Sequence, residues 1–259
     1  MSERVDELEK YYVPIERVDK ILSLLFILGA FLSLGILFIS NLDINNYDSI
    51  IKPFFILVVI LYTILSIVNS YYLIPNAEKF RRKQLLSNSF DISLIHEQTQ
   101  NYYNNEFEPT IKKLGMNVLE NSFFAKNICK EMLIRERVKN GIYFSIWLII
   151  LLNREVDLNY VLIITQTIFS GEIIIKWIKL EILKYQNEKI YEQLHFHFSQ
   201  GISNTSNNGI ANILDLVMSY EVAKGNASIK QSSKIFHKLN EKLSQEWEEI
   251  KIRLLSSNN

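Results

Sequence analysis

The sequence contains one cysteine, no excess of either charge and none of the short motifs that mark common enzymes. Cys129 is the single cysteine, which excludes an intramolecular disulfide and a cysteine-rich zinc site. Lys and Arg together number 28, and so do Asp and Glu. This balance argues against bulk electrostatic binding of nucleic acid and leaves room only for a local basic patch. Since a glycine-rich phosphate loop and a nucleophile elbow are also missing, we expect no enzyme activity, no cofactor and no metal.

Two long stretches without a single charged residue are the clearest feature that is present. Residues 21–42 and 53–77 consist mainly of Leu, Ile, Phe and Val, and a short polar loop separates them. A bilayer hydrocarbon core about 30 Å thick needs roughly 20 apolar helical residues to span it, and both stretches reach that length. The pattern predicts a transmembrane hairpin. The residues before it are polar and acidic, which does not fit a cleavable signal peptide.

Basic residues are frequent before and after this hairpin and rare in the loop that connects its two stretches. The connecting loop holds Lys52 alone, whereas four basic residues fall within residues 79–83 and four more precede the first stretch: Arg4, Lys10, Arg17 and Lys20. Short cytoplasmic flanks carry the excess of Lys and Arg in membrane proteins. We therefore predict that the N-terminus and the segment after residue 77 are cytosolic.

A second, weaker apolar region covers residues 141–178. As a helix, residues 141–152 are only about 18 Å long, which is too short to span a bilayer unaided. Lys139 and Arg154 bracket this part, and their long side chains can reach the headgroups from inside the bilayer. Residues 158–178 are long enough but contain Glu172 and Lys176. We predict a second, short transmembrane hairpin; a buried hairpin of a soluble domain and a re-entrant pair are the alternatives.

The expected fold class is all-α, because no convincing strand alternation occurs. We predict an integral membrane protein with two transmembrane helical hairpins, helical cytosolic regions and both termini in the cytosol. A helix start is expected at Asn88 or Ser89, residue types that often cap helices. The predicted domains are an N-terminal helix (1–20), the first hairpin (21–77), a helical linker domain (78–140), the second hairpin (141–178) and a helical C-terminal domain (179–259).

Small and polar residues at helical spacing mark candidate contacts or a water path within the membrane. A small-xxx-small pair lets another helix approach closely, and four polar residues of the second stretch share one face. A lone Ser or Thr usually bonds its own backbone, so packing is the alternative to a water-lined path. An acid within a span is a functional hypothesis. The candidates for a pore or helix contact are Gly29, Ser33, Thr63, Ser66, Asn69, Ser70 and Glu172.

Basic and aromatic residues of the region between the hairpins are candidates for binding an anionic ligand. Lys and Arg can hold phosphate groups, and tyrosine rings can stack on bases. The alternative is that the basic residues form solvated faces and a topology signal. His195 and His197 point apart if they lie on a helix, which argues against a metal site. The candidate ligand-binding residues are Arg81, Arg82, Lys83, Tyr102, Tyr103, Lys112 and Lys113.

The layout resembles the SMODS-associated four-transmembrane (S-4TM) effectors of bacterial nucleotidyltransferase-linked anti-phage defence systems. The resemblance covers most of residues 1–180 and rests on a charged helix at residues 77–85, on residues 90–94 and on the aromatic segment 102–105. The N-terminal alanine, glutamine and tyrosine pattern of that family is reduced here to Lys10-Tyr11-Tyr12 and Arg17.

The resemblance implies a multi-pass protein of the bacterial inner membrane that compromises the membrane under control of a nucleotide or short oligonucleotide made by a partner nucleotidyltransferase. From this and from the spans, we expect a homo-oligomer in lipid that forms or gates a pore. Two other classes stay open. A non-conducting, membrane-anchored interaction or sensor protein would carry the same hairpins, and a membrane enzyme would need a polar catalytic cluster that the sequence does not offer.

Overall fold

The computed structural model describes residues 5–40, 45–97, 99–100, 107–153, 155–168, 171–200 and 206–256. Within these ranges the regular secondary structure is helical apart from one antiparallel pair of two-residue strands, β1 (Val5–Asp6) and β2 (Thr99–Gln100). The helices are the 3-10 helix η1 (Glu7–Tyr11), α1 (Val13–Ser40), α2 (Asn45–Val68), the π-helix η2 (Asn69–Leu73), α3 (Ile74–Phe90), α4 (Ile111–Leu152), α5 (Leu158–Ile168), the π-helix η3 (Gly171–Ile175), α6 (Lys176–Ser199), α7 (Asn207–Ala227) and α8 (Ser233–Ser256). The expected all-α class is confirmed.

The chain divides into two compact units, each assembled from separate stretches of sequence. Unit 1 comprises residues 1–12, 75–134 and 179–259, and unit 2 comprises residues 13–74 and 135–178. The strongly apolar stretches fall in unit 2, whereas the charged stretches fall mostly in unit 1. Helices α4 and α6 each contribute residues to both units.

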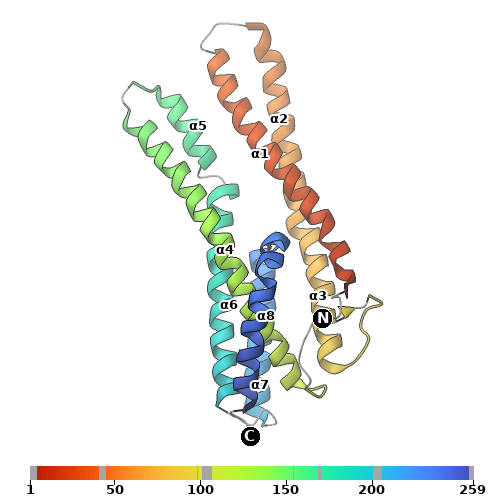
Figure 1. The fold of residues 1–259 in the computed structure, drawn as a ribbon. Coiled ribbons are helices and arrows are strands. Elements are labelled where there is room, and N and C mark those ends of the chain that lie inside the picture. Colours follow the sequence, from red (N-terminus) through yellow and green to blue (C-terminus); the bar gives the residue numbers. More distant parts are fainter. Residues whose placement is uncertain are drawn as a thin grey trace. The chain divides into compact units, whose positions relative to one another are not determined.

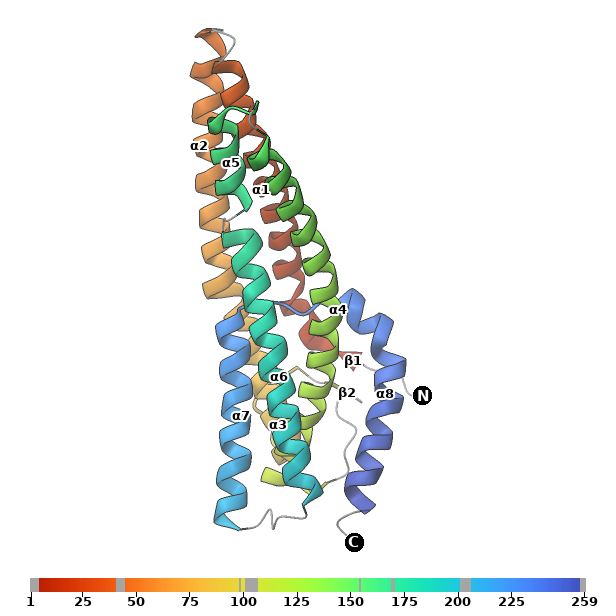
Figure 2. The same ribbon diagram turned by 90° about the vertical axis from the view of Figure 1, so that its left-hand side faces the viewer.

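In unit 2, α1 and α2 form an antiparallel pair that lies side by side in both ribbon views (Figures 1 and 2). Gly29 of α1 faces this contact, because a Cβ added to it would lie 3.9 Å from Cγ1 of Val58. Asn69 of η2 donates a hydrogen bond of 2.7 Å from Nδ2 to Oδ1 of Asp19 in α1. A small residue and a polar bond therefore both serve the packing of this hairpin.

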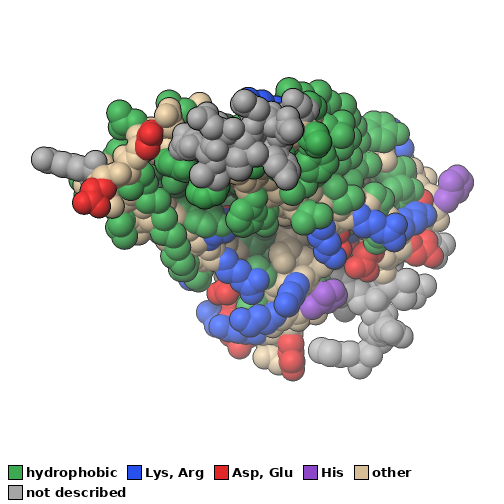
Figure 3. All heavy atoms as spheres, turned by 90° about the horizontal axis from the view of Figure 1, so that it is seen from above, with side chains coloured by type: hydrophobic (Ala, Val, Ile, Leu, Met, Phe, Trp, Pro, Cys, Tyr) green, Lys and Arg blue, Asp and Glu red, His purple; other side chains and the backbone are tan. Residues whose placement is uncertain are grey.

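Most of the apolar surface of unit 2 is exposed. In the most apolar windows of the helical stretches Glu7–Ile36 and Ile50–Phe90, only 6% of the residues are buried inside the protein. Figure 3 shows hydrophobic side chains over a large part of the visible surface. Exposed apolar area costs roughly 25 cal/mol per Å² in water, and hydrocarbon removes that cost.

Within the part of the chain that the structure describes, three helical stretches are long and apolar enough to cross a membrane: Glu7–Ile36, Ile50–Phe90 and Leu158–Ser199. They include residues 21–36 of the first expected span, the whole second span and the described part of residues 158–178. Residues 141–152, expected as a short span of their own, are the C-terminal end of the long helix α4. Among the described residues this segment is not one of the three, and the two-hairpin arrangement stays a prediction.

The core of unit 1 is formed by α3, α4, α6, α7 and α8. Helix α7 contributes Ile213, Val217 and Tyr220 at helical spacing, and α8 contributes the fully buried Trp247. The helices pack closely around Gly115 of α4. A Cβ added there would lie 3.0 Å from side-chain atoms of both Ile213 and Phe198.

The helix start expected at Asn88 or Ser89 is wrong, since α3 continues through both residues and ends at Phe90. The next residue, Asp91, has a positive φ of 53°, the left-handed conformation that often ends a helix. Asn117 of α4 donates hydrogen bonds from Nδ2 to Oδ1 of Asn88, at 3.0 Å, and to Oγ of Ser89, at 2.9 Å. These polar side chains therefore join two helices and cap neither.

Exposure to lipid can be separated from exposure to water by one pair of substitutions. Ile60 in α2 and Ile92 in unit 1 are both 50% exposed. Arginine at a lipid-facing helix centre costs about 2.5 to 3.5 kcal/mol, whereas a substitution at a water-facing position usually changes stability by less than about 0.5 kcal/mol. We expect Ile60→Arg to lower the thermal stability and membrane yield of the protein in lipid nanodiscs and Ile92→Arg to leave both unchanged. Equal effects would contradict a lipid-facing α2.

The close approach at Gly115 predicts opposite results for two Gly→Ala substitutions in unit 1. Gly115→Ala should destabilise the full-length protein by about 1 to 3 kcal/mol, because the added methyl group overpacks the contact with Ile213 and Phe198. Gly225 in α7 has nothing within 4 Å of an added Cβ, so Gly225→Ala should stabilise by up to about 1 kcal/mol. Thermal unfolding of both variants checks this. If Gly115→Ala stabilised the protein, the contact of α4 with α6 and α7 would have room for a methyl group, and the close approach would be wrong.

Candidate functional site

Unit 1 contains a cavity of about 400 Å³ whose wall combines charged and aromatic side chains. The N-terminal segment contributes one side of the wall, and α3, α7 and α8 contribute most of the rest. Three cations and three carboxylates line it among the described residues, together with the imidazole of His237 and three benzene-type rings: Arg81, Lys224, Lys230, Asp6, Glu9, Glu78, Tyr12, Tyr220 and Phe236. A concave site with a few convergent polar groups is the usual form of a ligand pocket.

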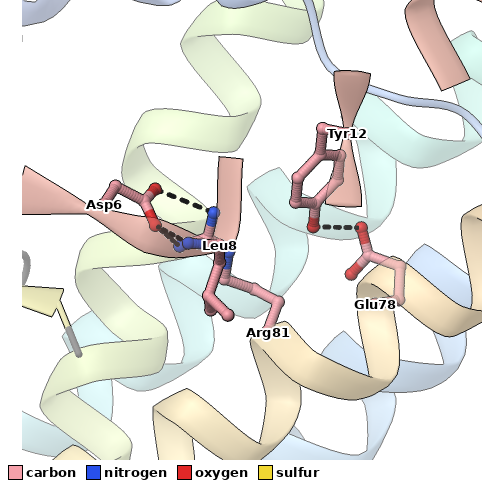
Figure 4. A network of polar contacts seen from close by, with 5 residues as sticks. All are labelled: Asp6, Leu8, Tyr12, Glu78 and Arg81. Atoms are coloured by element: carbon pink, nitrogen blue, oxygen red, sulfur yellow. Dashed lines mark hydrogen bonds and ion pairs between the residues drawn. The ribbon is translucent and has the colours of Figure 1, made fainter. Parts of the chain in front are cut away.

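The N-terminal segment is fixed to α3 by an ion pair. The guanidinium of Arg81 donates from Nη2 to Oδ2 of Asp6, at 2.9 Å, and from Nη1 to Oδ1, at 3.3 Å. The same carboxylate accepts a hydrogen bond of 3.1 Å from the backbone amide of Leu8 and so caps η1 (Figure 4). A bidentate guanidinium–carboxylate pair is among the stronger polar contacts in proteins.

A second polar chain crosses the cavity wall from the N-terminal segment to α7. The hydroxyl of Tyr12 donates to Oε1 of Glu78, at 3.2 Å (Figure 4). Lys224 contacts the carboxylates of Glu78, at 2.9 Å, and Glu221, at 3.1 Å, with only 12% of its side chain exposed. Burial alone would lower the pKa of Lys224, but the negative charge of Glu78, supported by Tyr220 and Glu221, outweighs it and holds that pKa well above its ordinary value. Lys224 is therefore a permanent cation at physiological pH.

Aromatic rings complete the attachment of the N-terminal segment. The Tyr11 ring stacks on Phe80 of α3, with centroids 4.1 Å apart and an angle of 9° between the planes. Its hydroxyl donates to Glu97 at 2.6 Å, and Lys10 pairs with the same carboxylate at 2.9 Å. Arg81 and Lys230 each lie 5.5 Å from the centroid of the Tyr12 ring, within the range of a cation–π contact.

The predicted ligand-binding set is only partly brought together. Arg81 lines the cavity, whereas Arg82 is exposed and neither it nor Lys83 belongs to the wall. Lys112 lies over the ring of Phe107, 4.7 Å from its centroid, and Lys113 also lies outside the wall. Tyr102 and Tyr103 lie outside the described residues. The sequence reasoning missed the residues of the wall that come from the two ends of the chain: Asp6, Tyr12, Lys224 and Lys230.

The polar stripe of the second apolar stretch consists of Thr63, Ser66, Asn69 and Ser70, and internal contacts partly occupy it. Asn69 is buried and bonded to Asp19, and Thr63 donates to the carbonyl oxygen of Val59 in its own helix, at 2.9 Å. Ser33, Ser66 and Ser70 are half-buried. Glu172 belongs to η3, and its side chain lies outside the described atoms.

His195, His197 and Cys129 lie in packed surroundings. His195 and His197 both lie on α6, as expected, where His195 packs against Tyr191 with ring centroids 5.7 Å apart. Burial raises the pKa of the Cys129 thiol to about 12, which keeps it protonated and unreactive. Among the described residues no group of three or more His, Cys, Asp or Glu side chains could hold a metal ion.

Comparison with protein-family models, with curated proteins and with solved structures finds no match in any of the three. The assignment of a function therefore rests on the apolar helices of unit 2 and on the cavity of unit 1.

The buried ion pairs of the cavity predict a non-additive loss of stability. Lys224→Gln leaves two carboxylates without their shared cation and should cost about 3 kcal/mol or more, whereas Glu78→Gln should cost about 1 to 3 kcal/mol. The double variant should lose less than the sum, because both changes break one contact. Chemical unfolding of the full-length protein measures all three.

The pH dependence of the Lys224 contribution follows from its raised pKa. A cation whose pKa is raised by folding contributes fully below its ordinary value, here 10.5, and loses that contribution only as the pH rises through the folded value. The cost of Lys224→Gln should therefore stay constant between about pH 6 and 9. A destabilisation by Lys224→Gln that becomes smaller between these pH values would contradict the ion pairs of Lys224. So would a double variant whose loss of stability equals the sum of the two single losses.

Proposed function

We propose that this chain is a membrane-embedded effector that forms or gates a pore, as a homo-oligomer in the bacterial inner membrane with both termini in the cytosol. The observation that carries the proposal is the exposed apolar surface of unit 2, which only lipid or further copies of the same helices would cover. One copy has too few apolar helices to enclose a wide water path, so a pore requires several copies. The role in anti-phage defence rests on the resemblance to the S-4TM effectors alone.

Control by a soluble signal follows from the danger of an open pore. A channel in the cytoplasmic membrane would kill its host unless it is held shut, and a ligand shifts such an equilibrium only if it binds the two forms with different affinity. We propose a nucleotide or short oligonucleotide, made by a partner nucleotidyltransferase, as that ligand. The cations and aromatic rings of the cavity in unit 1 match its phosphate and base groups in kind.

A second function is favoured by the contacts of the polar stripe. The bond from Asn69 to Asp19 and the bond from Thr63 to its own helix both serve helix packing. If the remaining polar residues do the same, no water path exists, and the chain is a non-conducting, membrane-anchored oligomeric interaction or sensor protein. The two functions differ in one measurable property, which is conductance.

Depolarisation of the inner membrane separates the two functions. If the stripe lines a water path, unregulated expression should collapse the membrane potential, as read from a voltage-sensitive dye, and Ser66→Leu combined with Asn69→Leu should abolish the collapse because it removes the polar lining. Glu172→Gln should change ion preference or gating if its side chain faces the path. Immunoblots of washed membranes confirm that each variant is inserted.

A matched control is Ser145→Leu in α4, a serine that is exposed and donates to the carbonyl oxygen of Gly141 in its own helix at 2.8 Å. This change of the same size should leave depolarisation intact. Full depolarisation by the Ser66→Leu, Asn69→Leu variant would show that the stripe serves packing only. No depolarisation by the parent protein, alone or with a partner enzyme, would favour the non-conducting function.

A further inference from the structure

The carboxylates that line the cavity of unit 1 fall into two groups that differ in how they are held. Asp6 and Glu9 lie on the N-terminal segment 5–12, which is a two-residue strand followed by a single 3-10 helix. Glu78 lies on the 17-residue helix α3. The cations lie on α3, on α7 and on the connection between α7 and α8. Most of the negative charge of the cavity therefore belongs to a short segment, and the positive charge belongs mainly to packed helices.

We propose that the N-terminal segment 5–12 occupies an anion-binding site as an internal competitor, and that a phosphate-bearing ligand displaces it from Arg81, Lys224 and Lys230. Only the consequence of this displacement, the gating of a pore, rests on the function proposed above. The binding itself depends on the geometry of the cavity.

The charge of the cavity favours such an exchange. With the segment in place, the three cations face three carboxylates; without it, Arg81, Lys224 and Lys230 face Glu78 alone among the described lining residues. Glu221 also pairs with Lys224, at 3.1 Å, and stays in place on α7. The three cations less these two carboxylates leave a net charge of about +1, which favours a phosphate-bearing anion. The guanidinium fork that now binds Asp6 in two places accepts phosphate oxygens with the same geometry.

The aromatic rings narrow the class of ligand further. Tyr220 and Phe236 line the cavity from α7 and α8, so they remain when the segment leaves. An aromatic wall beside a cationic one suits a ligand that joins a phosphate to a flat or apolar group. A soluble phosphate ester and the phosphate headgroup of a lipid share this chemistry.

The segment is directly continuous with the first apolar helix. Tyr12, whose hydroxyl donates to Glu78, immediately precedes Val13, the first residue of α1. Loss of the contacts of Asp6, Tyr11 and Tyr12 would therefore release the N-terminal end of a helix that is long and apolar enough to cross a membrane. This covalent link is how an exchange of anions in unit 1 would reach unit 2.

The binding test measures the affinity of full-length protein in detergent for inorganic pyrophosphate by isothermal titration calorimetry. Asp6→Asn keeps the acceptor for the Leu8 amide but removes the competing charge, so it should tighten pyrophosphate binding about tenfold. Arg81→Gln should weaken binding by at least about tenfold, since it removes the fork. Glu7→Gln, on the same segment, and Lys79→Gln, on α3, lie outside the cavity wall and are the matched charge controls.

Release of the segment is measured separately by hydrogen exchange of the amides in residues 5–12. Pyrophosphate should speed this exchange in the parent, and Asp6→Asn should speed it without pyrophosphate. Slower exchange on binding would show that the segment closes over the ligand, which overturns the competition. Absence of pyrophosphate binding to both the parent and Asp6→Asn, or binding that Asp6→Asn weakens, overturns the proposal as well.

Two further arms identify the source of the phosphate and separate this proposal from the pore. Faster exchange in nanodiscs that contain phosphatidic acid, compared with phosphatidylcholine alone, would assign the site to a lipid headgroup; faster exchange only with pyrophosphate would assign it to a soluble ligand. In proteoliposomes, binding and release without current would overturn the pore and leave the exchange standing. A current that is the same in the parent and in Asp6→Asn, with and without pyrophosphate, would overturn the link to gating.

Discussion

The apolar surface of α1 and α2 is the constraint on which the rest of unit 2 depends. These helices bury little of themselves against the protein, and they are long and apolar enough to cross a membrane. In hydrocarbon a backbone amide or carbonyl cannot bond to water, and a helix satisfies both within itself. Polar side chains face the same limit, and in unit 2 several of them find internal partners. Asn69 bonds to Asp19, and the indole of Trp147 in α4 donates to Thr165 in α5 at 2.8 Å.

The helices of unit 1, in contrast, are polar on one face and bury the other face in a core. Five helices share that core around Trp247 and Phe123, whose ring centroids lie 6.1 Å apart. The unit is assembled from three separate stretches, and the ion pair between Glu78 and Lys224 joins two of them. The cavity therefore depends on contacts between residues that are far apart in the sequence. A ligand bound there would touch residues from separate stretches of the chain.

Local patterns in the sequence were sufficient for the helices and insufficient for the cavity. Uninterrupted apolar runs and helical periodicity depend on neighbouring residues, and they predicted the all-α fold and the long apolar helices. The cavity depends on pairs that are far apart in sequence, such as Asp6 with Arg81. Arg81 was found because it lies in a basic cluster, whereas the largely buried Lys224 lies in no motif that would distinguish it from the lysines of the surface. Asn88 and Ser89 were misread because residues suited to capping also suit hydrogen bonds between helices, and only the packing of α3 against α4 decides between these roles.

The π-helical turns η2 and η3 contain two of the polar residues that the sequence marks as candidates in unit 2. A π-helical turn inserts one residue into an α-helix, and such turns are frequent at functional sites. Both described turns belong to unit 2, and each follows an apolar helix: η2 follows α2, and η3 comes after α5. Asn69 is the first residue of η2, and Glu172 is the second residue of η3. Two polar residues that the sequence alone singled out thus lie where the helical ladder is locally widened. The insertion shifts the faces of the helix on either side of it, and in η2 it coincides with the bond from Asn69 to α1. A rearrangement of α1 that starts at the N-terminal segment would act directly on this bond, because Asp19 lies only seven residues after Tyr12 in the chain.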